Sequence, residues 1–230
     1  MRRTARFALR CAPTLAAVIL LLPIANAQGL TADKGKFRDM VNGKQVGSEQ
    51  FEITSNGGGW VARGTSEVKP AQGPETHISS VLQLRTDGAP RHYEWTTIAG
   101  TKKAAASIDF DNGTATIHLQ VNGGKMFTQQ FFFKTPVVVI LDDNLYHQYA
   151  ILADLYDWSK KGPQTFPVLI PQEMTPGTIT VEARDSDDQD GKNLQELKVH
   201  SQDLDIILYL EGKRLVRIAV PSANAEIVRE

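Results

Sequence analysis

The residues best suited to acid–base chemistry in this 230-residue chain lie close together near its middle. Asp142 and Asp143 are followed within five positions by Tyr146 and His147, and a carboxylate beside an imidazole can act as a general acid and base. One hypothesis is therefore a hydrolase that uses Asp142, Asp143 and His147, with help from Tyr146. The alternative is structural: the aspartates cap a helix, and His147 lies on the polar side of that helix.

Motifs of the common enzyme classes are missing from the sequence. There is no G-x-S-x-G nucleophile motif, no phosphate-binding P-loop and no dinucleotide fingerprint after a strand. The remaining histidines stand singly on strand-like segments, without a ligand partner at helical spacing: His77, His92, His118 and His200. We therefore expect no catalytic motif, no metal site and no cofactor.

A group of aromatic and apolar residues in the same region favours a second hypothesis, a non-catalytic binding or structural role. The group consists of Phe131, Phe133, Tyr149, Leu152, Tyr156 and Trp158. Such side chains either line a site for an apolar ligand or fill the core, and the sequence leaves both alternatives open. We take these six as the candidate ligand-binding residues.

The first 27 residues have the layout of a secretory signal peptide. A start rich in arginine precedes an apolar run over residues 14–24, and Ala25-Asn26-Ala27 supplies small residues for cleavage before Gln28. The run is roughly half of the ~20 residues that a membrane-spanning helix needs. We therefore expect residues 1–27 to be removed, and residues 28–230 to form one exported domain, periplasmic or extracellular.

Removal of the leader changes the charge and the redox chemistry of the chain. Four of the 25 basic residues and the only cysteine, Cys11, lie in the leader, which leaves 21 basic and 26 acidic side chains and a net charge of −5. The mature chain forms no disulfide. An acidic balance disfavours nucleic acid as a partner, and no mature segment is long and apolar enough to span a membrane. The expected partner is an apolar ligand or an envelope protein.

Turn signals recur along the chain and predict an antiparallel meander. Seven Asn-Gly, Asp-Gly or Glu-Gly pairs separate strand-like segments, and Asn and Gly readily adopt the left-handed backbone of tight hairpin turns. The pairs are Asn42-Gly43, Asn56-Gly57, Asp87-Gly88, Asn112-Gly113, Asn122-Gly123, Asp190-Gly191 and Glu211-Gly212. From Thr114 to Val121 the side chains alternate between polar and apolar, as in a strand with one buried face.

One segment departs from this pattern and predicts a helix over residues 143–158. It has no glycine or proline, and Asp142 or Asp143 is a suitable N-cap. The segment is apolar on most sides, which indicates that it is covered on most sides. The predicted fold is therefore mainly β: a single curled antiparallel sheet, half-barrel-like, with one principal helix packed on its concave face.

Both ends of the chain carry hairpin motifs that suggest a family. Residues 42–51 read N-G-K-Q-V-G-S-E-Q-F, and residues 212–221 read G-K-R-L-V-R-I-A-V-P. They resemble exported bacterial β-proteins of unknown function that open with an NGKxVGxExF hairpin. Some such families are similar to the outer-membrane lipoprotein carrier fold, and this likeness implies lipid or lipoprotein handling without catalytic residues.

Overall fold

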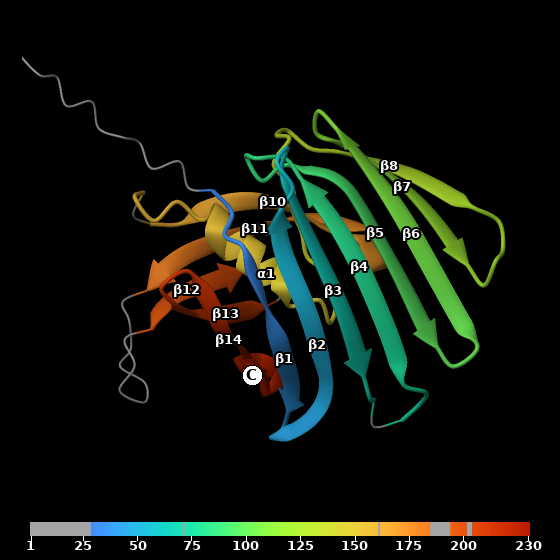
Figure 1. Cartoon of the computed structure of the whole chain (residues 1–230), viewed down its shortest axis with the longest axis horizontal. Coiled ribbons are helices and arrows are strands. Elements are labelled where there is room, and N and C mark those ends of the chain that lie inside the picture. Colours follow the sequence, from blue (N-terminus) through green and yellow to red (C-terminus); the bar gives the residue numbers. More distant parts are fainter. Residues whose placement is uncertain (1–28, 71, 161, 185–193, 202–203) are drawn as a thin grey trace, which may run out of the picture.

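The computed structural model describes residues 29–70, 72–160, 162–184, 194–201 and 204–230. The predicted leader and the Asp190-Gly191 turn lie outside these residues. The described chain forms one sheet of fifteen strands around one α-helix (Figure 1). The mainly β fold expected from the turns and the alternating segments is thus confirmed.

The strands follow one another along the sheet in two runs, one from each half of the chain. The first run is β1 (Asp33–Val41), β2 (Lys44–Ser55), β3 (Trp60–Val68), β4 (Thr76–Leu84), β5 (Pro90–Ala99), β6 (Lys102–Asp111), β7 (Thr114–Val121) and β8 (Phe127–Phe132). The second run is β9 (Val139–Ile140), β10 (Gln164–Ile170), β11 (Thr175–Arg184), β12 (Gln195–His200), β13 (Asp205–Glu211), β14 (Arg214–Val220) and β15 (Ala225–Arg229). The helix α1 (His147–Leu155) lies between β9 and β10 in sequence, and short 3-10 helices η1 (Pro171–Glu173) and η2 (Pro221–Ala223) follow β10 and β14.

The two runs join where the first strand meets the last. β1 pairs antiparallel with β2 on one side and with β15 on the other. Strands β8 and β9 therefore form the two edges, and the sheet is not closed into a barrel. All neighbours are antiparallel except β9 and β10, which are parallel.

Six of the seven predicted turn pairs lie among the described residues, at connections between consecutive strands. Asn42, Asn112 and Asn122 have positive φ angles of 51°, 46° and 51°. The glycines that follow them have φ angles of 72°, 83° and 69°. Two successive left-handed residues make the type I′ turn that suits two-residue hairpins, as between β1 and β2 and between β6 and β7. Asn122-Gly123 marks the end of β7, but β8 begins only at Phe127.

The helix is shorter than the sequence pattern predicts, and the predicted cap is wrong. α1 begins at His147, after Tyr146, which makes no side-chain capping bond. Asn144 has a left-handed backbone with φ of 63°, which interrupts helical geometry before that point. At the other end Tyr156 is extended. Asp142, expected to cap the helix, instead accepts hydrogen bonds from the Tyr93 hydroxyl and the Gln172 backbone.

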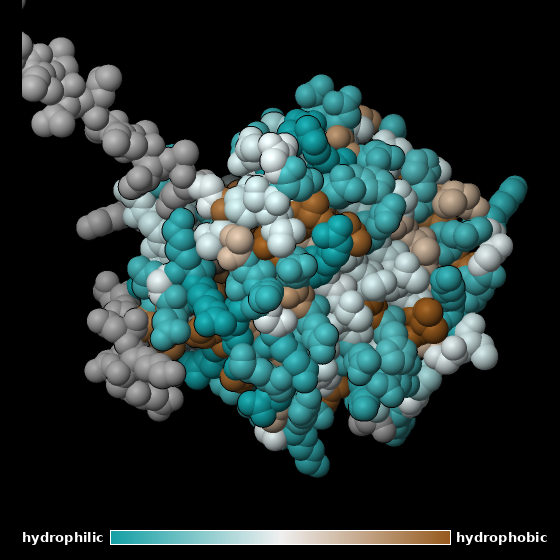
Figure 2. Space-filling view, in the orientation of Figure 1, coloured by the Kyte–Doolittle hydropathy of each residue, from teal (hydrophilic) through white to brown (hydrophobic). Residues whose placement is uncertain are grey.

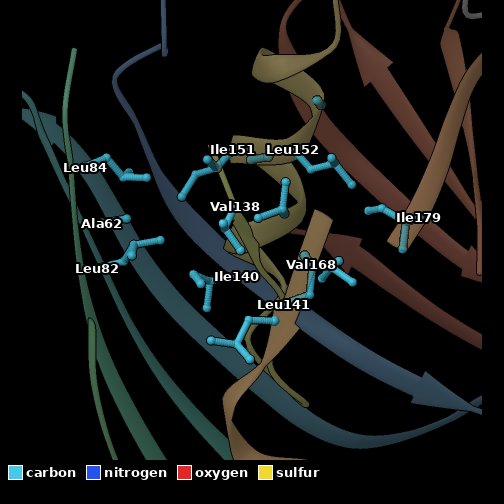
Figure 3. Close-up of a cluster of buried hydrophobic side chains, with 14 of the residues drawn as sticks. Ala62, Leu82, Leu84, Val138, Ile140, Leu141, Ile151, Leu152, Val168 and Ile179 are labelled. Atoms are coloured by element: carbon cyan, nitrogen blue, oxygen red, sulfur yellow. The ribbon is translucent and has the colours of Figure 1, made fainter. Parts of the chain in front are cut away.

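The helix packs on the concave side of the curled sheet, as expected (Figure 1). Figure 3 shows Ile151 and Leu152 between Leu82 and Leu84 of β4 on one side and Val168 of β10 on the other. Even the polar residues of its first turn, His147 and Gln148, are fully buried. The polar side expected for this helix is therefore not exposed at its start.

Candidate functional site

The buried acid–base pair of this protein joins the start of α1 to strand β2. His147 Nδ1 lies 2.6 Å from Glu49 Oε1, and the His147 backbone amide donates to Glu49 Oε2 at 3.0 Å. Both side chains are 0 % exposed. Phe51, two residues along β2, stacks on the imidazole with the ring centres 6.0 Å apart. Glu49 thus supplies from a strand the carboxylate that would otherwise come from an N-cap residue.

Gly64 on β3 makes room for this pair. A Cβ atom at Gly64 would lie 2.5 Å from His147 Cε1 and 2.7 Å from Glu49 Oε1. Such distances are far below van der Waals contact, so no larger residue fits without a shift of the imidazole or the carboxylate. The helix start, β2 and β3 are therefore packed as one unit around the pair.

Further polar atoms are buried on the inner face of the neighbouring strands. His147 Nε2, Ser66 Oγ on β3 and Trp95 Nε1 on β5 have no hydrogen-bond partner among the described residues. Glu49 lies opposite Ser66 in the β2–β3 register. A glutamate that orients an imidazole is an arrangement used for proton transfer. Because His147 is fully buried, however, its ring cannot touch a substrate in this structure.

A second buried network surrounds Asp142. Tyr93 donates from its hydroxyl to Asp142 Oδ2 at 2.6 Å, and the Gln172 backbone amide donates to Oδ1 at 2.8 Å. Gln148 Nε2 donates to the Tyr93 hydroxyl at 3.2 Å, and its carbonyl accepts from the Asp142 amide at 2.6 Å. Burial raises the pKa of Asp142 to about 7, and it also raises the pKa of Tyr93.

The other residues of the hydrolase hypothesis, Tyr146 and Asp143, form hydrogen bonds with other groups. Tyr146 donates to Asp39 Oδ2 at 2.7 Å, and burial raises the pKa of both side chains. Asp143 is exposed, and its backbone oxygen accepts from Gln172. Asp142 and His147 bond to different residues, Tyr93 and Glu49. The structure therefore does not bring Asp142, Asp143 and His147 together as one acid–base site.

The six aromatic and apolar candidates belong to the core or pack against it. Leu152 and Tyr156 are 0 % and 1 % exposed, and the other four are partly buried. Tyr156 meets Trp158 edge-on at 5.1 Å, and its hydroxyl donates to the Gly162 carbonyl. These contacts describe a filled region around Tyr156. The assignment of the six residues to a ligand site stays a prediction.

The sequence reasoning missed Glu49, although a signal for it exists. Glu49, Phe51 and Ile53 occupy alternate positions of β2, so they share one face of that strand. A lone carboxylate in an otherwise apolar alternation predicts a buried charge with a partner. Its position within the V-G-S-E-Q-F motif was visible, but the partner His147 lies 98 residues away.

Apolar side chains are exposed mainly on the hairpin formed by β7 and β8, residues 114–132. Among the described residues, the large apolar side chains that are exposed are Ile98, Val121, Met126, Phe127, Phe132 and Leu204. Four of these six belong to the β7–β8 hairpin, with exposed fractions from 51 % for Val121 to 78 % for Phe132. The face visible in Figure 2 is mostly polar, with separate apolar areas.

Two hollows elsewhere on the surface have charged side chains at their borders. One of about 220 Å³ lies beside α1 and is bordered by Asp33, Asp154, Lys213 and Arg214. Another, of about 530 Å³, is bordered by Arg184, Lys198 and Asp205 among others. Neither hollow is lined by Glu49 or His147.

The described residues contain no group of three or more His, Cys, Asp or Glu side chains arranged to hold a metal ion. Within the same residues, no helix has the length and apolar character needed to cross a membrane.

Comparisons with known proteins show relatives in structure but not in sequence. No protein-family model matches the chain, and no curated protein has a significantly similar sequence. A β-barrel-like protein of the domain of unknown function DUF1849 from Brucella abortus matches with a TM-score of 0.57 at 10 % identity, over 87 % of this chain and 95 % of that one. A DUF1089 family protein from Pseudomonas aeruginosa matches with a TM-score of 0.50 at 9 % identity, over 76 % of this chain and 90 % of that one. At these identities the likeness shows the fold alone, which is shared with proteins of unknown function.

Proposed function

We propose that this chain is an exported, non-catalytic binding protein of the bacterial envelope, and that its β7–β8 hairpin contacts the ligand. The observation that carries the proposal is the distribution of its side chains. The Glu49–His147 pair and Asp142 are sealed inside the protein, whereas four of the six large apolar side chains that are exposed among the described residues lie on this one hairpin.

The exposed apolar groups have a free-energy cost that a binding role explains. Contact with water is unfavourable by ~25 cal/mol for each Å² of apolar surface. Clustered exposed apolar side chains therefore mark interaction sites more often than scattered ones do. Val121, Met126 and Phe127 lie at the same end of the hairpin, at and next to the β7–β8 turn. This end would contact an apolar ligand or an apolar segment of an envelope protein.

Two further features agree with an envelope role. The leader predicts export, and the opening and closing hairpins resemble exported bacterial β-proteins, some of them similar to lipoprotein carriers. Catalysis has less support, because His147 is 0 % exposed and Asp142 and Asp143 do not join it. Lipid or lipoprotein handling is the finer form of this proposal.

Native mass spectrometry of the mature protein, purified from its own periplasm, tests the proposal. We expect a bound lipid or protein on the wild type, and loss of that bound mass in a Phe127→Ser/Phe132→Ser variant. Ile98→Ser is the matched control, since Ile98 is 42 % exposed but lies on β5, outside the hairpin. A wild type without any bound mass, or equal retention by both variants, would count against the proposal.

A further inference from the structure

We infer that the free edge of β8 is a docking site for an extended strand of another envelope protein, an apolar strand with acidic residues at both ends. This strand would add to the sheet beside β8. The inference rests on the proposed binding function and names the partner for its hairpin. It is argued from the main chain, the exposed side chains and the charges of β8.

Among the residues that the structure describes, none pairs with the outer side of the β8 main chain. Phe127–Phe132 pairs with β7 on its inner side, and β8 is the last strand of the sheet at this edge (Figure 1). The Phe133 amide donates to the Gly113 carbonyl at 2.7 Å, which fixes the direction of the backbone at residue 133. Because direction alternates along an antiparallel strand, Thr128, Gln130 and Phe132 present their amides and carbonyls to the outside.

This edge lacks the features that usually protect an exposed strand. The sequence F-T-Q-Q-F-F has six residues, with no charge and no proline. Natural edge strands are commonly guarded by charged side chains, proline, short length or a covering segment. The opposite edge follows that rule, because β9 has two residues and both are buried. An uncharged edge of six residues, without proline, is suited to strand addition by a partner.

The charges around β8 indicate what kind of strand it pairs with. No aspartate or glutamate occurs between Asp111 and Asp142 in the sequence. Lys125 and Lys134 are exposed and lie just before and just after β8. This basic stretch stands out in a mature chain with an expected net charge of −5. A partner strand with acidic residues at both ends would place opposite charges beside the two lysines.

The same lysines argue against a second copy of this chain as the partner. Antiparallel pairing through the outward residues would set Gln130 of one copy opposite Gln130 of the other, and would gather Lys134 of one copy near Lys125 of the other at each end of the paired strands. Like charges that are brought close together repel each other. The exposed Phe132 side chain, 78 % exposed on the outermost strand, is available to pack on a neighbouring strand instead.

Fluorescence anisotropy with the mature protein and labelled synthetic peptides tests the inference. The probe is a ten-residue peptide with two glutamates at each end and six alternating valines and threonines. Two control peptides change one property each: one has its six central amides N-methylated, and the other has lysines in place of the glutamates. We expect saturable binding of the first peptide and at least tenfold weaker binding of both controls.

Protein variants test whether the peptide binds at the outer edge of β8. Gln130→Pro removes an outward amide and no main-chain hydrogen bond to β7, whereas Gln130→Ala retains that amide. Both variants lose the hydrogen bond from Gln130 Nε2 to Thr116 Oγ1 on β7, so that loss is matched between them. We expect at least tenfold weaker peptide binding by Gln130→Pro and near wild-type binding by Gln130→Ala. Equal binding of the N-methylated peptide, or equal binding by two folded Gln130 variants, would overturn the inference. If Gln130→Pro does not fold, the N-methylated peptide alone decides.

Two further measurements separate this inference from the proposed function. Binding of the apolar dye N-phenylnaphthylamine that is lost in Phe127→Ser, without peptide binding, would overturn strand addition and leave the proposed function standing. Absence of both kinds of binding counts against both. Sedimentation that shows a dimer of the wild type but not of Gln130→Pro would overturn the inference in favour of a second copy.

Discussion

Glu49 and His147 are joined by a 2.6 Å contact between two side chains that are both 0 % exposed. The contact links the second strand of the sheet to the first residue of the helix. It therefore fixes where α1 begins on the concave face, in the absence of a capping side chain next to the helix in sequence.

Removal of either partner of this pair should destabilise the protein strongly. His147→Ala leaves the Glu49 carboxylate buried without the imidazole, and such a loss costs roughly 3–5 kcal/mol. His200→Ala is the control, because His200 contacts Asp205 at the surface and its side chain is 62 % exposed. It should change the free energy of unfolding by no more than about 0.5 kcal/mol. Urea unfolding measures the free energy of unfolding of both variants. If the wild type has a reproducible hydrolase activity and a folded His147→Ala protein has lost it, the protein is an enzyme and the proposed binding function is wrong.

A methyl group at Gly64 should disturb the same pair from the sheet side. Gly64→Ala places a Cβ atom 2.5 Å from His147 Cε1, and overpacking of this kind costs roughly 1–3 kcal/mol. Gly58→Ala is the matched control, since nothing lies within 4 Å of its Cβ position. Thermal unfolding should show a lower Tm for Gly64→Ala alone. Equal Tm values for the two variants would mean that the imidazole moves at no cost.

Leu152 should be a main contributor to stability within α1. The side chain is 0 % exposed and packs in the central cluster, so Leu152→Ala should lower the free energy of unfolding by roughly 2–5 kcal/mol. Ile98→Ala, at an exposed position, should change it by no more than about 0.5 kcal/mol. Denaturant titration of both variants gives the comparison. A loss below 1 kcal/mol for Leu152→Ala would contradict tight packing of the helix.

Asp142 should make the stability of the protein fall as the pH rises from about 4 to 7. Its pKa is raised by burial from 3.8 to about 7, so the folded state holds a proton that the unfolded state has released in this range. The Asp142 contribution is fully present below pH 4 and declines by up to ~1.4 kcal/mol per pH unit above it. Asp142→Asn has no such proton, so its stability relative to the wild type should rise with pH.

Chemical denaturation at several pH values between 4 and 8 measures this difference. Asp157→Asn is the control: the hydrogen bond from Ser159 lowers the pKa of Asp157, so its contribution is lost only as the pH falls below its usual range. The difference in free energy of unfolding between Asp157→Asn and the wild type should stay constant between pH 5 and 8. A flat difference for Asp142→Asn as well would rule out a proton held by Asp142 in the folded protein.

The parts of the fold that could be predicted from the sequence are those that local chemistry decides. Asn-Gly pairs specify left-handed turns within two residues, and the alternating segment Thr114–Val121 has the same bounds as β7. The burial alternates over the first four residues of β7 and is lost toward Val121, which is exposed. The helix position was also predictable, but its first residue was not. Asp142 is a good N-cap by residue type. Its carboxylate instead accepts a hydrogen bond from Tyr93, which lies 49 residues earlier in the chain. Competition from a distant partner leaves no local signal.

The candidate site was less predictable than the fold for the same reason. His147 could be singled out by its residue type, but its burial depends on Glu49 and on the space left by Gly64. The exposed edge at β8 was also hidden, because Phe131, Phe132 and Phe133 read as three equivalent aromatic residues. Only the folded structure shows which face of the sheet is covered, so that Phe132 is exposed while Phe131 packs against the core.

The pairing of β1 with β15 has a consequence for the order in which the chain folds. Ribosomes make the chain from its N-terminus, so β1 is complete nearly 200 residues before its neighbour β15. Until β15 is made, β1 has no neighbour on one side, although it lies in the middle of the finished sheet. The meander of residues 33–132 then has two unpaired edge strands, β1 and β8. The pairing of β1 with β15 requires contacts between residues that are far apart in the sequence, and such contacts slow folding. Slow folding extends the time during which a chaperone can bind the unfinished sheet.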